Sequence, residues 1–208
     1  MTGVEDKQFR EITNSATLAL PDGMPLVWSA RLLGFDQPER VYGPDLFLTL
    51  CEKSVDNGYS HFLYGGGTGV PQRLAENLSH RFPGIRIVGC YYPPFRPLTQ
   101  SEDDRVVKAI NESGADILWV GLGAPKQEYW MASHMKRISV PVMVGVGAAF
   151  DFHSGTVKQA PLWMQKHGLE WLFRLSQDPK RLWKRYCYYN PLFIYHVTKQ
   201  IVSQRVLK

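Results

Sequence analysis

Short apolar runs alternate with longer segments of helical spacing along most of this sequence. The apolar runs span residues 17–20, 61–64, 85–90, 117–120 and 140–144, and the helical segments span 26–33, 45–57, 71–82, 101–113 and 125–138. Strands that alternate with helices of this length predict a parallel sheet with crossover helices. After the first run the strands show little polar alternation, as expected when both faces are covered. The sequence therefore predicts an α/β fold, a Rossmann-like parallel sheet flanked by helices.

Local signals indicate where several of these helices begin. Pro71 and Pro125 suit a first helical turn, where a missing N–H costs little. Ser101, with Asp104 three residues later, resembles a capping box. These signals support the helix boundaries given by the apolar spacing.

The alternation stops near Gln159, and the remainder is helical over residues 162–167, 169–176, 180–188 and 192–204. Pro179 and Pro191 divide this stretch, because the residue before a proline is disfavoured in helical geometry. We therefore expect an α/β core over residues 1–158 and a helical C-terminal appendage over residues 159–208.

The net charge of +5 is concentrated in the appendage. Residues 1–169 hold 16 Lys and Arg against 17 Asp and Glu, whereas residues 170–208 hold 8 against 2. A basic tail indicates an anionic partner, which is a phosphate group, an acidic membrane surface or a nucleic acid. Its interleaved Trp, Tyr and Phe residues suit a bilayer headgroup region, so we expect no nucleic-acid partner. A solvated basic face packed on the core or on another subunit is the alternative.

The sequence excludes some other classes of protein. It has no run of about 18 uncharged apolar residues and no signal-peptide layout, so we expect neither a membrane span nor export. Its three cysteines are far apart. That spacing indicates no disulfide framework and no zinc site, and it is typical of the cytoplasm.

Glycines and polar residues follow three of the predicted strands, where open α/β sheets bind ligands. The run Gly65-Gly66-Gly67-Thr68-Gly69 separates a strand from a helix and suits a phosphate, although a tight turn without a ligand is the alternative. The two later strands are followed by further candidates: Gly123, Lys126, Gln127 and Glu128, then Asp151 and His153. A lone histidine is more often structural, and first-turn residues such as Glu128 also compensate the helix dipole.

Two further candidates lie before the first well-defined strand. Asp22, between Pro21 and Gly23, suits either proton abstraction from a substrate hydroxyl or an N-cap for the helix from Pro25. Arg40 suits a phosphate or carboxylate, or it pairs with Glu39 or Asp45. In the appendage, Arg174, Arg181 and Arg185 offer guanidinium groups for a diphosphate.

Six motifs in order resemble the WecG/TagA/CpsF glycosyltransferases, also called glycosyltransferase family 26. They are PDGMPLVW, PERVYGPDL, GGGTGVPQRLAENL, VGLGAPKQEYWM, GVGAAFDFHSGTVKQAP, and GLEWLFRL followed by DPKRLWKRY. The resemblance covers roughly residues 9–193. By contrast, an NAD(P) oxidoreductase predicts GxGxxG with an acidic residue about 20 positions later, and GGGTG followed by Arg86 does not fit.

The resemblance implies an inverting enzyme that moves a hexosyl, N-acetylhexosaminyl or uronosyl group from a UDP-sugar to a polyprenyl-diphosphate-linked saccharide. Such enzymes act at the inner face of the bacterial plasma membrane, as peripheral proteins, in teichoic acid, exopolysaccharide and related polysaccharide biosynthesis. The resemblance implies no metal and no cofactor.

The same resemblance assigns roles to individual residues. It makes Asp22 the general base and Arg40 and Gln127 further catalytic residues. The nucleotide-sugar contacts would be Gly66, Gly67, Thr68, Gly69, Gly123, Lys126, Glu128 and Asp151. The lipid diphosphate would meet Arg174, Arg181 and Arg185, with Lys184 as a competitor for the last position.

One departure from the family pattern bears on activity. Family members begin with a further strand and loop that carry Thr and Asn active-site residues, and we expect that strand to be absent here. The alternative function is therefore a truncated, inactive, membrane-associated paralogue that binds lipid-linked sugar or a partner enzyme. The sequence leaves open the donor sugar, the acceptor and whether the protein forms a homo-oligomer.

Overall fold

The computed structural model describes residues 2–36 and 38–206, with side chains through residue 203. The chain divides into two compact units, Gly43–Lys158 and Met1–Tyr42 together with Gln159–Lys208. The C-terminal helices thus share a unit with the first 42 residues, which the sequence pattern had grouped with the α/β core. Each unit is described by itself.

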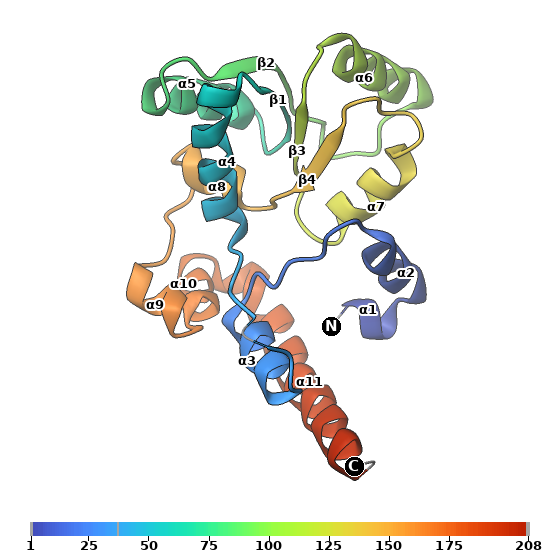
Figure 1. Ribbon diagram of the computed structural model, residues 1–208, viewed down its shortest axis with the longest axis vertical. Helices are drawn as coiled ribbons and strands as arrows, with labels where there is room; N and C mark the ends of the chain where they lie inside the picture. Colours follow the sequence, from blue (N-terminus) through green and yellow to red (C-terminus); the bar gives the residue numbers. More distant parts are fainter. Residues whose placement is uncertain (1, 37, 207–208) are drawn as a thin grey trace. The chain divides into compact units, whose positions relative to one another are not determined.

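The unit Gly43–Lys158 contains a parallel sheet in the order β2-β1-β3-β4 (Figure 1). Its strands are β1 (Ser60–Gly65), β2 (Arg86–Tyr91), β3 (Ile117–Gly121) and β4 (Val142–Gly145). They coincide with four of the five predicted runs. At the carboxyl ends, Gly65 pairs with Gly121 and Val120 pairs with Gly145, so these ends lie together at one edge.

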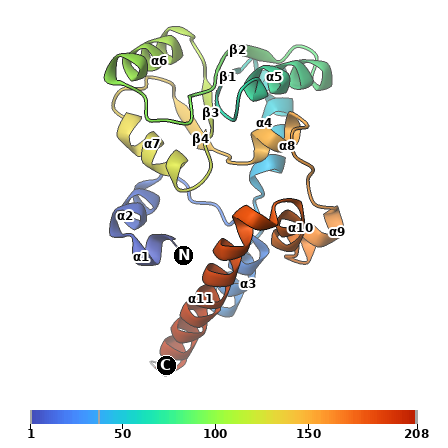
Figure 2. The same cartoon turned by 180° about the vertical axis from the view of Figure 1, so that it is seen from behind.

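Helices cover both faces of this sheet (Figures 1 and 2). Their bounds are α4 (Gly43–Asn57), α5 (Val70–Arg81), α6 (Gln100–Glu112), α7 (Lys126–His134) and α8 (Ala149–His153). Apolar residues of α4, α5 and α8 pack on one face around Leu63 and Trp119, and those of α6 and α7 pack on the other around Leu118 and Val120. The predicted Rossmann-like α/β fold is confirmed.

A buried histidine lies within the first of these cores. His61 is fully buried in β1, and its Nδ1 accepts a hydrogen bond from Trp119 Nε1 at 2.9 Å. Nε2 therefore carries the proton of a neutral ring. Burial lowers the pKa of His61 to about 4, and the charge of Asp116 opposes this only in part.

Because His61 is buried in its neutral form, we predict that the free energy of unfolding falls as the pH falls from 7 to 5. An unfolded histidine takes up a proton near pH 6.5, whereas folded His61 stays neutral in this range, so the unfolded state binds more protons. We expect His61 to account for a loss of about 2 kcal/mol in the free energy of unfolding over this range.

Urea denaturation at a series of pH values measures this loss. His153 acts in the same direction, because burial lowers its pKa too. The His61→Gln variant isolates the effect of His61, since glutamine keeps an acceptor for Trp119 but does not titrate. An equally steep decline in His61→Gln would show that His61 is not the cause.

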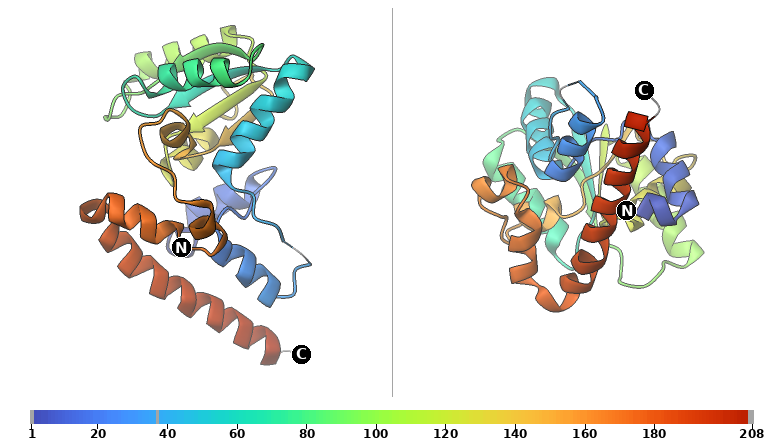
Figure 3. Two further views of the ribbon diagram at one scale, coloured as in Figure 1. Left: turned by 90° about the vertical axis from the view of Figure 1, so that its left-hand side faces the viewer. Right: turned by 90° about the horizontal axis from the view of Figure 1, so that it is seen from below.

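The other unit is helical within its described residues (Figure 3). Its helices are α1 (Thr2–Glu5), α2 (Lys7–Ser15), α3 (Met24–Leu32), α9 (Leu162–Lys166), α10 (Glu170–Gln177) and α11 (Pro179–Val206). The helices α10 and α11 pack on each other, with the rings of Trp171 and Tyr186 edge to face at 5.7 Å. None of the described helices is both long and apolar enough to cross a bilayer.

Three local expectations were wrong. Residues 17–20 form no strand, because this run is exposed and has no strand beside it. Pro191 lies inside the single helix α11, where it removes one N–H donor without ending the helix. The capping box of α6 is formed by Thr99 and Glu102, two residues before the predicted pair.

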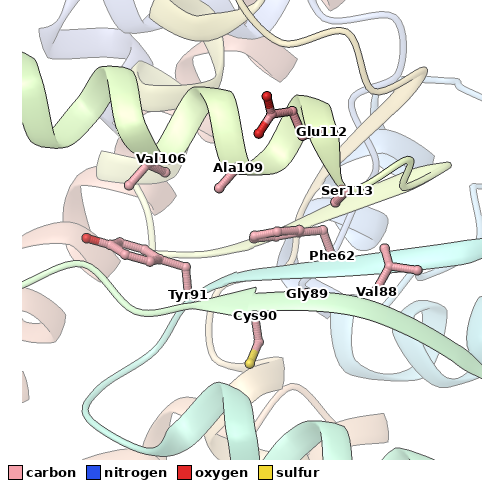
Figure 4. A pocket seen from close by; sticks show the side chains of 9 residues that line it. All are labelled: Phe62, Val88, Gly89, Cys90, Tyr91, Val106, Ala109, Glu112 and Ser113. Carbon is pink, nitrogen blue, oxygen red and sulfur yellow. The ribbon is translucent and has the colours of Figure 1, made fainter.

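One hollow of about 330 Å³ lies on the α6 side of β1 and β2 (Figure 4). Phe62, Val106 and Ala109 give it an apolar lining, and Glu112 lies at its border. The thiol of Cys90 points away from α6. None of the site residues predicted from the sequence lines this hollow. The predicted glycines and Gln127 instead lie near the carboxyl ends of β1 and β3.

Candidate functional site

Glycines allow close backbone contact where β1 and β3 end. The N–H of Gly66 donates to the carbonyl of Gly121 at 2.9 Å. Gly65 has a φ of +130°, and a Cβ on it would lie 2.6 Å from the carbonyl carbon and oxygen of Gly121. A side chain at this position would force the two strands apart, so the glycine is needed for the close contact itself.

The loop after β1 leaves only some of its N–H groups available to a ligand. Gly66 uses its N–H in the contact with Gly121. In the described part of the chain, the N–H groups of Gly67, Thr68 and Gly69 have no hydrogen-bond partner. Gly69 is the N-cap of α5, whose N-terminus carries partial positive charge. The part of the loop that suits an anion is therefore Gly67–Gly69.

Gln127 is fixed by two hydrogen bonds near the ends of β3 and β4. Its side-chain oxygen accepts from the N–H of Gly147 at 3.0 Å, and its Nε2 donates to Glu128 Oε1 at 3.0 Å. The residue is only 8% exposed. The other carboxylate oxygen of Glu128 is buried and has no partner among the described residues. This arrangement holds one amide in a set orientation beside a carboxylate that can still accept a hydrogen bond.

The remaining candidates of this unit differ in their surroundings. Gly123 has a φ of +76° and accepts the N–H of Gln127 at 3.1 Å, so it shapes the turn into α7. Lys126 is exposed, and Asp151 is half-buried within α8. His153 donates from Nε2 to the carbonyl of Pro44 at 2.9 Å and stacks on Phe47, which supports its structural role.

A second hollow, of about 320 Å³, lies where β2 ends and α5 begins. It is lined by Gln72, Cys90, Tyr91, Tyr92 and Pro94. Tyr92 and the amide side chain of Gln72 line this hollow in the same unit as the Gly67–Gly69 loop, whereas the ring of Tyr91 lies on the α6 side of the sheet and stacks on Tyr64 (Figure 4). Such a lining suits a flat polar ring, because it offers a stacking surface and a hydrogen-bonding group.

Asp22 and Arg40 meet in the other unit. Arg40 Nε donates to the main-chain carbonyl of Asp22 at 2.6 Å, and the N–H of Val41 donates to the carbonyl of Pro21 at 3.0 Å. Asp22 is exposed, and the N-cap of α3 is Gly23. Asp22 therefore lies one residue before the N-cap position of α3, with its side chain at the surface.

Arg40 has an ion-pair partner that the sequence did not suggest. Its Nη2 donates to Glu170 Oε2 at 2.9 Å, rather than to Glu39 or Asp45. Its Nη1 lies 3.4 Å from the carbonyl of Gln165, and its guanidinium lies 4.0 Å from the ring centre of Tyr42.

Comparison with known proteins identifies the family of the chain. Residues 1–206 match the model of a protein family described as "Glycosyl transferase WecG/TagA/CpsF family". The chain belongs to this family. Two relatives are each named N-acetylglucosaminyldiphosphoundecaprenol N-acetyl-beta-D-mannosaminyltransferase. The one from Bacillus spizizenii is 34% identical over 182 residues, 88% of this chain and 68% of the relative. The one from Bacillus subtilis (strain 168) is 33% identical over 184 residues, 88% and 69% of the two chains. The protein is a member of a family of glycosyltransferases.

The arginines that the family resemblance assigns to a lipid diphosphate lie on two helices. Arg174 is half-buried on α10, whereas Arg181 and Arg185 are exposed on α11, one turn apart. Arg181 also pairs with Asp178 at 2.7 Å, with its own side chain 73% exposed. An exposed pair of this kind is weak and leaves the guanidinium able to exchange partners.

The structure thus sorts the family's candidate residues into two groups. The glycine loop, Gln127 and Glu128 belong to the α/β unit, and Asp22, Arg40 and the C-terminal arginines belong to the helical unit. Sequence reasoning missed Tyr42 and Glu170. The motif GLEWLFRL contains Glu170, but only an acidic residue at a helix start was visible there.

Proposed function

We propose that this protein transfers a sugar from a UDP-sugar to a saccharide carried on a polyprenyl diphosphate, with inversion at the anomeric carbon. The single observation that carries the proposal is the state of Asp22. It is an exposed carboxylate whose main chain is held by Arg40, one residue before Gly23, the N-cap of α3. A carboxylate held in this way can accept a proton from an incoming hydroxyl.

The bond changes of the proposed reaction need one base. The acceptor oxygen forms a bond to the anomeric carbon, the bond from that carbon to the diphosphate oxygen breaks, and Asp22 takes the hydroxyl proton. UDP leaves with the bonding electrons, and its new negative charge requires hydrogen-bond donors already in place. The N–H groups of Gly67, Thr68 and Gly69 are suited to that charge, together with the N-terminus of α5.

The other proposed roles follow from chemical character. The ring of Tyr92 would stack on the nucleobase, and Gln127, Glu128, Lys126 and Asp151 would contact the donor sugar and phosphates. Arg174, Arg181 and Arg185 would bind the lipid diphosphate, and the basic, aromatic α11 would dock on the inner face of the membrane. Each basic residue close to an anionic surface contributes about 1 kcal/mol.

The two Bacillus relatives indicate which substrates to test first. By their names, both add N-acetyl-β-D-mannosamine to N-acetylglucosaminyl-diphosphoundecaprenol. We therefore propose a UDP-N-acetylhexosamine as donor and a short-chain analogue of this lipid-linked acceptor.

Transfer is tested by mass spectrometry of the lipid product, with a panel of UDP-sugars and with or without anionic vesicles. We expect one UDP-N-acetylhexosamine to give product. Because the proposed reaction inverts the anomeric carbon, an α-linked donor should give a β-linked sugar in the product. Absence of product with every donor would contradict the proposal and favour the alternative in which the chain binds lipid-linked sugar without transferring it.

The proposed role of Gln127 predicts a functional effect for Gly145→Ala. A Cβ on Gly145 would lie 2.9 Å from Gln127 Nε2, so the amide must shift from its hydrogen bonds. We expect kcat to fall roughly 10- to 100-fold, since displacements of about 1 Å have effects of this size. The free energy of unfolding should change by less than about 1.5 kcal/mol, because the side chain's end can move.

Gly43→Ala is the matched control, because a Cβ there meets only ordinary contacts at 3.6 Å or more. Steady-state kinetics and urea denaturation of both variants make the comparison. Equal activity of Gly145→Ala and Gly43→Ala would argue against a role for Gln127 in the reaction.

A further inference from the structure

Glu170 joins two segments of its unit that are far apart in the sequence. One carboxylate oxygen accepts from Arg40 Nη2 at 2.9 Å, and the other accepts from the Tyr42 hydroxyl at 3.0 Å. The side chains of Arg40 and Glu170 are only 16% and 17% exposed. A pair sheltered to this degree is less screened than a surface pair, and removal of one partner leaves a poorly solvated charge.

Tyr42 supports this pair from a second direction. Burial raises the pKa of the Tyr42 phenol, and the neighbouring Glu170 carboxylate raises it further. The phenol therefore remains a hydrogen-bond donor at neutral pH. Its ring lies under the guanidinium of Arg40, 4.0 Å from the ring centre, in a cation–π contact. The orientation of Arg40 is thus set by Glu170 and Tyr42 together.

Arg40 in turn holds the main chain at Asp22. The bond from Arg40 Nε to the carbonyl of Asp22 is 2.6 Å long, and the bond from the N–H of Val41 to the carbonyl of Pro21 lies beside it. These two bonds tie the Pro21–Asp22 loop to the segment that carries Arg40. A shift of the guanidinium would therefore be passed to the main chain of Asp22.

We propose that Glu170 is a positioning residue for sugar transfer, which orients Arg40 so that Arg40 fixes the main chain of Asp22. This inference rests on the proposed function, in which Asp22 is the general base. Proton abstraction depends steeply on the placement of the base, whereas the donor contacts of the proposed function lie outside this loop. Loss of the Glu170 charge should therefore lower kcat and leave the KM for the donor unchanged.

Three variants test the proposal in steady-state kinetics. Glu170→Gln keeps the size of the side chain and removes its charge, and Glu170→Asp keeps the charge. Glu11→Gln is the control, because Glu11 forms an exposed pair with Lys7 at 3.7 Å in the same unit. We expect kcat to fall 10- to 100-fold in Glu170→Gln with the donor KM within twofold of wild type. Glu170→Asp should recover most of this loss, and Glu11→Gln should match wild type.

Hydrogen–deuterium exchange supplies a readout that does not depend on activity. In Glu170→Gln, the amide of Val41 should exchange about tenfold faster, while the amides of β1 stay protected and show that the fold is intact. Wild-type kcat in Glu170→Gln, or a lower kcat with unchanged exchange at Val41, would overturn the proposal. If the wild-type protein gives no product, the proposed function fails. Faster exchange at Val41 in Glu170→Gln would then still show that Glu170 stabilises the Pro21–Asp22 loop. Unchanged exchange would overturn that part of the proposal.

Discussion

Asp22→Asn is expected to lower kcat for sugar transfer on the order of 10³-fold, the usual contribution of a positioned general base. Asparagine has nearly the same size as aspartate but does not accept the proton of the acceptor hydroxyl. The bond from Arg40 goes to the main-chain carbonyl of residue 22, so it persists in the variant. Affinity for UDP, measured by calorimetry, should stay within about twofold, because general-base catalysis acts on the transition state rather than on the bound donor.

Asp36→Asn provides the control for Asp22→Asn. Asp36 is another exposed carboxylate of the same unit, and we expect full activity when it is replaced. Near-wild-type turnover by Asp22→Asn would show that another group takes the proton. If Asp22→Asn lost both its turnover and its affinity for UDP, Asp22 would instead be assigned to donor binding.

Gly65→Ala is expected to destabilise the protein by more than about 3 kcal/mol, or to prevent folding. Its Cβ would lie within 2.8 Å of three main-chain atoms of Gly121, which belong to the neighbouring central strand. Backbone atoms in a sheet cannot rotate away as a side chain does, so β1 and β3 must separate. The positive φ of +130° adds strain for any residue with a Cβ.

Gly58→Ala separates the two sources of this loss. Gly58 lies just before the same strand with a φ of +71°, and a Cβ there meets nothing within 4 Å. We expect a cost of about 1–2 kcal/mol from the positive φ alone. Urea denaturation followed by circular dichroism measures both variants. Equal losses of stability in the two variants would mean that the close contact between Gly65 and Gly121 adds nothing to the cost of the positive φ.

The fold could be predicted well from local patterns. The apolar runs near residues 61, 87, 118 and 143 each became a strand preceded by a helix; the central strands β1 and β3 are buried throughout, whereas the outer strands β2 and β4 are partly exposed. The run at residues 17–20 failed because apolar character alone does not supply a neighbouring strand. The helix α11 continued through Pro191 because the loss of one N–H is small beside the other hydrogen bonds of a 28-residue helix.

The candidate site was predicted in part. The residues of the glycine motifs and PKQE do lie after the ends of β1 and β3, but the use of the Gly66 N–H by Gly121 was not visible in the sequence. For Asp22 the sequence left a base and an N-cap open, and the structure puts Gly23, one residue later, at the N-cap position of α3. Helix capping depends on where the helix begins, to within one residue.

The sequence alone determined the order of strands and helices, the glycine turns at the strand ends, the basic character of the C-terminal helices and the resemblance to a glycosyltransferase family. These properties depend on neighbours within a few residues or on a motif read in order. The tertiary structure decided which groups meet, such as Gln127 with Gly147, and Arg40 with Glu170, which is 130 residues away. Hydrogen bonds of this kind form between groups that only the folded path of the chain brings within about 3 Å, so no local pattern specifies them.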